Sequence, residues 1–148
     1  MAYGRIVIRV TDTVEIERPP AEVFAYVTDP AKLPTWQDVE EVVQLTPGPV
    51  GVGTRFREVH KVLGVRREQI TEVVAFEADA RFEIRVVEGP PVDGRWDVAP
   101  APAGTWLTFV PTARLPGPLA VAAPVVELMT ALVMSRFHRR LKRVLEAR

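Results

Sequence analysis

The sequence of 148 residues contains no cysteine. Thiol nucleophiles, disulfide bridges and cysteine-based metal sites are therefore excluded, so any chemistry must use oxygen, nitrogen or a borrowed cofactor. The chain also lacks an excess of charge of one sign, since 19 Lys and Arg residues balance 19 Asp and Glu residues. A nucleic-acid-binding surface normally needs a basic excess, so we predict no nucleic-acid partner.

Several catalytic motifs and targeting signals are missing as well. There is no glycine-rich phosphate loop, no G-x-S-x-G elbow and no HExxH pair, so nucleotide, serine-hydrolase and zinc-protease activities lack support. The two histidines, His60 and His138, are far apart in the sequence, and we expect no metal and no cofactor. Arg5 and Arg9 interrupt the N-terminal apolar run, which makes a poor secretory signal, so a cytoplasmic protein is expected.

Alternation of apolar and polar residues predicts an antiparallel sheet. Between Ile6 and Ile16 all apolar residues except Val7 share one parity, and Asp12 is the one misfit on the apolar side. Short turn-like breaks separate the later strands, so the middle of the chain is expected to be a meander of hairpins without parallel crossovers. These later strands are predicted over residues 39–45, 54–63, 66–76, 81–88, 94–98 and 105–115.

Three helices are expected outside the strands. Pro20 suits the first position of a short helix, and Asp29 with Pro30 begins a second one that ends near Trp36. From Pro124 to the C-terminus, apolar residues recur at spacings of three and four, which predicts a long helix that covers the apolar face of the sheet. A seven-stranded sheet with these helices makes an α+β fold.

The stretch from Pro118 to Arg143 is apolar at first and basic at its end, as a membrane anchor is. Pro124 and Glu127 interrupt the apolar run, which is shorter than the roughly 20 residues that a spanning helix needs. We therefore predict no transmembrane segment, with transient contact at a membrane surface as an alternative. The basic cluster is interpreted as a solvated helix end, and docking on an anionic membrane or an acidic protein is the alternative. The cluster consists of Arg136, Arg139, Arg140, Lys142 and Arg143, and His138 among them is expected to be solvated.

Short motifs follow one another in an order that is informative for the fold. They are Val14-Glu15-Ile16, Pro20-Ala21-Glu22-Val23-Phe24 with Val27, Asp29-Pro30 through Trp36, Gly51-Val52-Gly53-Thr54 with Phe56, Gly89 through Gly94, and Gly104-Thr105. Together with the order of elements, these motifs resemble the START-like, or SRPBCC, superfamily, and within it the polyketide cyclase/dehydrase and lipid transport group. The resemblance covers nearly all of residues 1–148 and implies a single ligand-binding domain of the helix-grip fold. In this fold a curved sheet wraps around the C-terminal helix and leaves an elongated apolar cavity.

Candidate ligand-binding residues follow from the expected cavity. The resemblance implies that the segment after the short helices borders the cavity mouth, and a polarizable methionine suits a pocket for an irregular apolar ligand. Packing in the core is the alternative role for the tryptophans and for the residues of the long helix. The candidates are Trp36, Phe56, Phe82, Ile84, Trp96, Phe109, Met129, Leu132, Val133 and Phe137.

Glu58 and His60 are the candidate catalytic residues. If Phe56 faces the cavity, the period of two along a strand sends both of them the same way. A carboxylate and an imidazole inside an apolar cavity can perform acid–base chemistry. The alternatives are that the opposite parity faces inward, or that the two side chains simply form hydrogen bonds within the wall.

Three functions are compatible with these features, because the superfamily includes carriers, receptors and aromatase/cyclases and does not imply one reaction. The first is a carrier or sensor that binds a small or medium hydrophobic ligand, such as a lipid, quinone or polyketide-like molecule. The second is a polyketide cyclase or dehydratase, a lyase or isomerase in which Glu58 or His60 abstracts a proton next to a carbonyl. The third is a protein-interaction module that docks through the basic C-terminal helix. Enzymatic activity is left open, and a monomer or a homodimer is expected.

Overall fold

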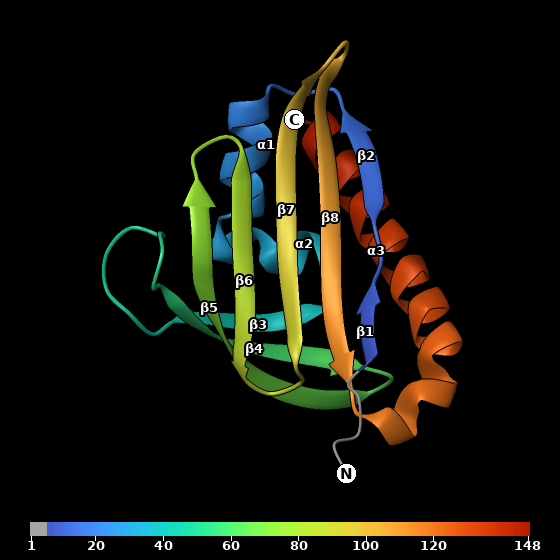
Figure 1. Ribbon diagram of the computed structural model, residues 1–148. Coiled ribbons are helices and arrows are strands. Elements are labelled where there is room, and N and C mark those ends of the chain that lie inside the picture. Colours follow the sequence, from blue (N-terminus) through green and yellow to red (C-terminus); the bar gives the residue numbers. More distant parts are fainter. Residues whose placement is uncertain (1–5) are drawn as a thin grey trace.

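The computed structural model describes residues 6–148, and Figure 1 shows how their elements are arranged. The prediction about Arg5 lies outside the described residues. The strands are β1 (Ile6–Arg9), β2 (Asp12–Ile16), β3 (Val39–Gln44), β4 (Arg55–Val62), β5 (Val65–Glu77), β6 (Arg81–Glu88), β7 (Val92–Ala101) and β8 (Gly104–Leu115). The α-helices are α1 (Pro20–Val27), α2 (Leu33–Trp36) and α3 (Ala123–Glu146), and the 3₁₀ turns are η1 (Pro30–Lys32) and η2 (Gly117–Ala122).

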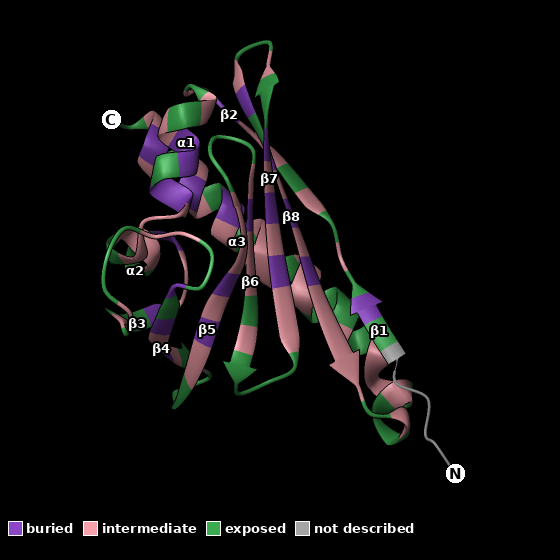
Figure 2. Cartoon of the chain, turned by 60° about the vertical axis from the view of Figure 1, so that its left-hand side comes forward, coloured by how far each residue is buried: buried purple, intermediate pink, exposed green. Residues whose placement is uncertain are grey.

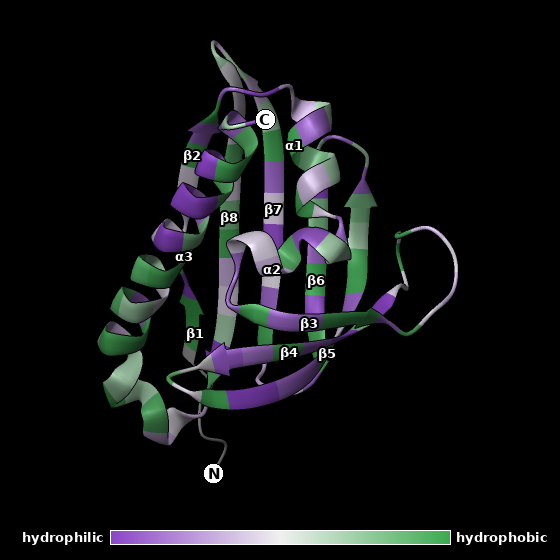
Figure 3. Cartoon of the chain, turned by 180° about the vertical axis from the view of Figure 1, so that it is seen from behind, coloured by the Kyte–Doolittle hydropathy of each residue, from purple (hydrophilic) through white to green (hydrophobic). Residues whose placement is uncertain are grey.

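All strands belong to one antiparallel sheet, in the order β1-β8-β7-β6-β5-β4-β3, with β2 also beside β8. Strands β5 to β8 run upright in Figure 1, whereas β3 and β4 cross behind their lower ends, so the sheet is strongly curved. Seen from behind, α1 and α2 lie in front of the sheet, and α3 runs along the edge formed by β1 and β2 (Figure 3). This arrangement confirms the predicted curved antiparallel sheet with a long C-terminal helix.

The predicted first strand is divided at Val10 and Thr11. Its two parts, β1 and β2, both pair with β8 and therefore continue one interrupted edge strand, which raises the predicted seven strands to eight. Asp12, the misfit in the apolar pattern, is the first residue after the break. Its carboxylate is hydrogen-bonded to a side chain of α3, which accounts for a polar residue on the side that faces the helix.

The two short helices form because prolines and a cap fix where they begin. Pro20 occupies the first turn of α1, and Asp29 accepts a hydrogen bond from the backbone N–H of Ala31 at 3.0 Å at the start of η1. The Tyr26 hydroxyl lies 2.7 Å from the hydroxyl of Thr35, which ties α1 to α2. Helix α1 thereby turns a buried apolar face toward the sheet and closes one end of the molecule (Figure 2).

Helix α3 has two halves with different surroundings. Its C-terminal half buries His138, Leu141 and Leu145 against the fold. The N-terminal half and the preceding turn expose large apolar side chains, which are Leu119, Val121, Val125, Leu128, Met129 and Leu132. Figure 3 shows the same division as hydrophobic lower turns and hydrophilic upper turns. By length and composition alone, residues 117–146 would be long and apolar enough to cross a membrane.

The prediction that the whole apolar stripe of α3 covers the sheet is therefore wrong for the N-terminal half. A helix turns by about 100° per residue, so a series built mostly from steps of four drifts around the axis. Val125 and Leu145, which belong to the same predicted stripe, project about 160° apart for this reason. Only the part of the stripe after about residue 134 faces the protein interior.

Candidate ligand-binding site

A cavity of about 180 Å³ lies between the sheet, the short helices and α3. An engineered apolar cavity of about 150 Å³ binds benzene, whereas sites for drug-sized ligands measure about 300–1,000 Å³. The volume therefore suits a molecule of one or two rings. Its wall includes Val27, Thr28, Pro30, Leu33, Trp36, Gln37, Phe56, Glu58, His60, Gln69, Thr71, Phe82, Ile84, Val86, Val92, Asp93, Gly94, Trp96, Phe109, Met134, Phe137 and His138.

Seven of the ten candidate ligand-binding residues line this cavity, namely Trp36, Phe56, Phe82, Ile84, Trp96, Phe109 and Phe137. The other three, Met129, Leu132 and Val133, are not part of its wall, and the first two are exposed to solvent. The drift of the stripe around α3 is the physical reason, because these three residues precede the turn at which the helix faces inward. Met134 lines the cavity in their place, so the expectation of a methionine in the wall applies to a different residue.

Aromatic rings form a continuous wall across the cavity. Trp96 stacks on Phe109 with ring centroids 4.1 Å apart, and it meets Trp36 edge-on at 6.4 Å. Gly94 stands beside this stack, and a Cβ atom there would lie 3.1 Å from the Phe109 ring. The glycine thus leaves the ring in place, and the wall offers flat apolar surfaces that suit a planar ligand.

Glu58 and His60 both line the cavity, which fixes the inward face of β4 as the one that carries Phe56. The Nε2 atom of His60 lies 3.1 Å from a carboxylate oxygen of Glu58, and the side-chain amide of Gln69 donates to the same oxygen at 2.9 Å. Glu58 is buried. The pair therefore combines a place in the cavity wall with hydrogen bonds inside that wall, two possibilities that the sequence posed as alternatives.

His138 is a cavity residue that the sequence analysis missed. It was expected to be solvated, which is wrong, since only 2% of its surface is exposed and it lines the cavity. Its Nδ1 atom is hydrogen-bonded to the Asp12 carboxylate across 126 positions of sequence. Burial lowers the pKa of His138 below the ordinary histidine value, although the Asp12 carboxylate acts in the opposite direction. The imidazole is therefore neutral at neutral pH.

Among the described residues, four buried side-chain polar atoms have no hydrogen-bond partner. They are Trp36 Nε1, Thr71 Oγ1, Trp96 Nε1 and His138 Nε2. All four residues line the same cavity. Buried polar atoms are nearly always paired in folded proteins, because leaving one unpaired costs about 1–3 kcal/mol. These four atoms are therefore the candidates for hydrogen bonds to a molecule bound in the cavity.

Metal binding has no comparable basis in the part of the chain that the structure describes. Within residues 6–148, no three or more His, Asp and Glu side chains gather where an ion would be held.

The curved sheet, the long C-terminal helix and the aromatic cavity define a START-like protein with a fold for binding hydrophobic ligands. More particularly, the chain belongs to the polyketide cyclase/dehydrase and lipid transport family, whose model matches residues 7–146. An uncharacterized protein of Mycobacterium tuberculosis is 29% identical over 144 residues, covering 93% of this chain and 84% of that protein. These matches confirm the superfamily that the sequence motifs resemble.

Solved structures with the same fold have little sequence identity to this chain. A protein of unknown function from Staphylococcus aureus superposes with a TM-score of 0.81 at 11% identity, covering 97% of this chain and 96% of that one. The di-domain ARO/CYC StfQ from the steffimycin biosynthetic pathway gives a TM-score of 0.76 at 15% identity, covering 96% of this chain and 50% of StfQ. At such identities the likeness extends to the fold alone.

Proposed function

We propose that the protein binds a small planar hydrophobic molecule of one or two rings in its cavity and acts as a carrier or sensor for it. The observation that carries this proposal is the aromatic cavity of about 180 Å³, whose wall contains four buried polar atoms without partners. Burial of about 200 Å² of apolar ligand surface contributes about 5 kcal/mol. Each hydrogen bond to an otherwise unpaired group adds about 1 kcal/mol, so affinities on the order of 10 μM are expected.

The test is native mass spectrometry of the freshly purified protein, followed by extraction and identification of any bound molecule. A stoichiometric apolar adduct is expected in the natural protein. Gly94→Leu should lose it, because a side chain there would be built toward Phe109 and Trp96 in the cavity wall. Gly51→Leu is the matched control, since a Cβ atom at Gly51 meets no atom within 4 Å. An apo mass that persists after incubation with mixed small aromatic molecules and lipids would contradict the proposal.

A second candidate function is that of a polyketide cyclase or dehydratase. Two observations favour it: Glu58 and His60 line the cavity side by side, and the family description includes cyclases and dehydrases. One of the two residues would take a proton from the carbon next to a carbonyl, and the dry cavity would hold the chain in the ring-closing geometry. Glu58→Gln and His60→Ala should then leave ligand affinity within a few-fold and abolish turnover. Loss of affinity or stability without a specific loss of turnover would exclude this function.

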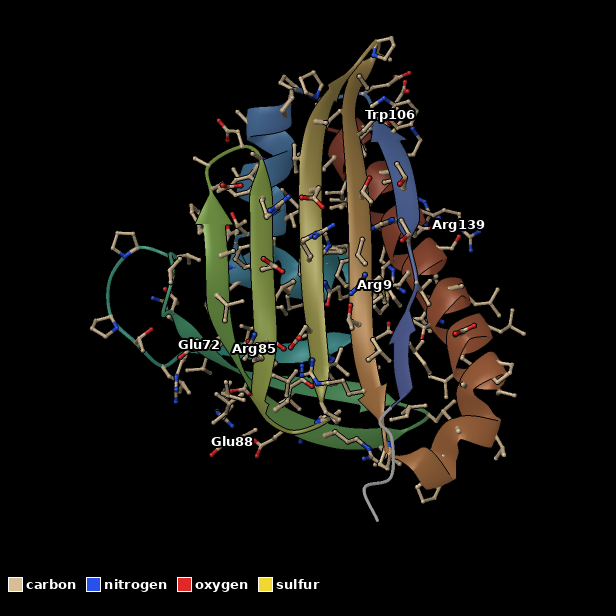
Figure 4. The ribbon with its side chains drawn as sticks, viewed as in Figure 1. Arg9, Glu72, Arg85, Glu88, Trp106 and Arg139 are labelled. Carbon is tan, nitrogen blue, oxygen red and sulfur yellow. The ribbon has the colours of Figure 1, made fainter. Side chains whose placement is uncertain are left out.

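For a carrier, we further propose that the outer face of α3 docks on an anionic membrane surface during ligand exchange. At about 100° per residue, Leu128 and Leu132 project within about 60° of Arg139 and Arg143 further along the helix. The first pair is apolar and exposed, and the second pair is basic and exposed. Arg139 projects outward from α3 in Figure 4. One face thus offers apolar side chains to the acyl boundary and cations to the phosphates, which is the pattern of interfacial helices.

Charge favours a lipid surface over a second copy of the chain as the partner of this face. Glu127, the carboxylate nearest to the apolar residues, lies about 140° around the helix from Leu132. Two copies that met through this face would therefore bring no carboxylate to the arginines. Arg136 and Arg140 already bind Asp38 of their own chain, and Lys142 binds Glu146. Of the basic cluster, Arg139 and Arg143 are therefore the cations left for a partner. Membrane crossing is disfavoured because the C-terminal half of α3 is part of the protein core.

Vesicle co-sedimentation tests this docking. Vesicles with about one third anionic lipid should retain the protein and neutral vesicles should not, because the arginines require the negative surface. The double variants Leu128→Gln/Leu132→Gln and Arg139→Gln/Arg143→Gln should both lose binding. Val52→Gln changes an apolar residue elsewhere that is at least as exposed, and this variant should keep vesicle binding. Equal binding to both vesicle types, a dimer that needs Leu132, or an acidic protein partner that needs Arg139 would each overturn the proposal.

A further inference from the structure

We propose that the Asp12–His138 pair anchors a hydroxyl group of the ligand, so that the bound molecule is a small hydroxylated aromatic compound. The inference rests on the proposed binding function and names the ligand class for the same cavity. It follows from the position of the pair, from which ring nitrogen of His138 donates and which accepts a hydrogen bond, and from the other unpaired groups in the cavity wall.

The contact with Asp12 leaves one ring nitrogen of His138 without a hydrogen-bond partner. Asp12 at the start of β2 takes the Nδ1 side of the imidazole, which fixes the ring between α3 and the sheet edge. The ring also meets Phe109 of the aromatic wall edge-on, with centroids 6.3 Å apart. Nε2 lies on the other side of the ring, is fully buried and has no partner among residues 6–148. His138 lines the cavity, and we infer that a cavity ligand supplies the missing partner of Nε2.

The contact with Asp12 determines whether Nε2 donates or accepts a hydrogen bond. An ionised carboxylate only accepts hydrogen bonds, so Nδ1 carries the proton and donates it to Asp12. Burial keeps the imidazole neutral, since it lowers the pKa of His138, and the remaining Nε2 therefore presents a lone pair. The other charged groups nearby do not change this. Asp38, at the junction of α2 and β3, is bound by arginines of α3, and Glu58 on β4 is bonded to His60 and Gln69.

The remaining unpaired groups can donate hydrogen bonds, whereas Nε2 accepts one. The indole nitrogens of Trp36 and Trp96 can only donate, and the Thr71 hydroxyl can donate or accept. The cavity therefore combines one acceptor on the α3 side with at least two donors along its aromatic wall. A planar molecule with a hydroxyl group on one side and carbonyl or ether oxygens elsewhere would satisfy all of them. A purely aliphatic chain would satisfy none.

A structural role is the competing explanation, because a buried Asp–His pair also holds α3 against the sheet. Such a role predicts no preference among ligands of equal shape, whereas the anchor prefers a ligand that donates a hydrogen bond. The two explanations therefore differ in ligand selectivity, and stability alone would not separate them.

Three probes of one ring system measure this selectivity: 1-naphthol, which donates a hydrogen bond, 1-methoxynaphthalene, which only accepts, and naphthalene, which does neither. Titrations followed by tryptophan fluorescence should show 1-naphthol binding about tenfold more tightly than 1-methoxynaphthalene, as for one hydrogen bond to a buried group. In Asp12→Ala, Nδ1 loses its acceptor and the tautomer is no longer fixed. The preference should fall to about twofold or less while naphthalene affinity stays the same.

Two controls separate the anchor from general damage to the fold. Asp38→Ala removes another carboxylate that holds α3 but that is not part of the cavity wall, and it should keep the tenfold preference. Nitrogen-15 NMR of the natural protein, which needs no variant, should show a protonated Nδ1 and an unprotonated Nε2 for His138. Equal affinity of the natural protein for 1-naphthol and 1-methoxynaphthalene, or a protonated Nε2, overturns the anchor and leaves the binding function standing. Failure of all three probes to bind overturns the binding function itself.

Discussion

Replacing one leucine at a time by alanine along α3 tests whether the helix is divided into a packed half and an exposed half. Leu141 is completely buried, whereas 59% of the surface of Leu132 is exposed. Both positions are interior to the same helix, so the substitution has the same effect on helix propensity at each site. Any difference in stability between the two variants therefore measures packing.

The expected magnitudes follow from burial. Leu141→Ala removes buried methyl groups and leaves a cavity, which costs about 3–5 kcal/mol of unfolding free energy. In a chain of this size that loss lowers the melting temperature by roughly 6–20 °C. Leu132→Ala removes atoms that are mostly in contact with water, and its cost should stay within about 0.5 kcal/mol.

Urea denaturation monitored by circular dichroism gives both free energies, with thermal melting as a second measurement. Leu145→Ala, at another fully buried position of the helix, should behave like Leu141→Ala and serves as the matched control. A loss of 2 kcal/mol or more in Leu132→Ala would mean that the N-terminal half is packed in solution. The exposed face, and the docking proposed from it, would then be refuted.

Two further predictions concern pH and backbone geometry. Burial lowers the pKa of His138 in the folded state, so below about pH 6.5 the imidazole is protonated in the unfolded protein before it is protonated in the folded one. The free energy of unfolding, measured in urea, should therefore fall as the pH drops through that value. It should level off once the pH is below the folded-state pKa. His138→Phe should flatten this slope, and an unchanged slope in His138→Phe would disprove the assignment. Gly104→Ala should cost about 2–3 kcal/mol in thermal melting, because its Cβ would lie 2.3 Å from a backbone oxygen. Gly64→Ala shares a positive φ but has open space, and a cost of about 1 kcal/mol is expected there; similar losses at both glycines would contradict the steric argument.

The strands were predictable because each has an apolar side and a polar side. The alternation at Phe82, Ile84 and Val86 predicted β6 with its observed bounds, and the turn residues between strands predicted the hairpins. The break after Arg9 was not predictable from alternation, since the pattern continues on the same parity across it. Asp12 marked the place, but a single polar residue does not reveal whether a strand bends or pairs with something distant.

The candidate site was predictable where it depends on strands and less so where it depends on α3. Period-two geometry correctly linked Phe56, Glu58 and His60, because the inward face of a strand is one of only two options. A helix offers a continuous choice of faces, and steps of three and four connect residues that end up on opposite sides. The Asp12–His138 pair was invisible for a different reason. Asp12 was visible only as a misfit in the alternation and His138 only as one polar residue among arginines, and their contact exists only because β2 and α3 lie side by side.

The break in the edge strand at Val10 and Thr11 also bears on how the protein avoids self-association. An edge strand presents free backbone N–H and C=O groups, on which another chain can add a strand. Fibril-forming segments typically need about six or seven continuous residues of high β propensity. The run IVIRVTDTVEI is long and β-branched enough to qualify, yet the break divides it into strands of four and five residues, Ile6–Arg9 and Asp12–Ile16. Each piece is shorter than such a segment, so the break next to the histidine-binding aspartate makes this edge of the sheet a poorer template for added strands.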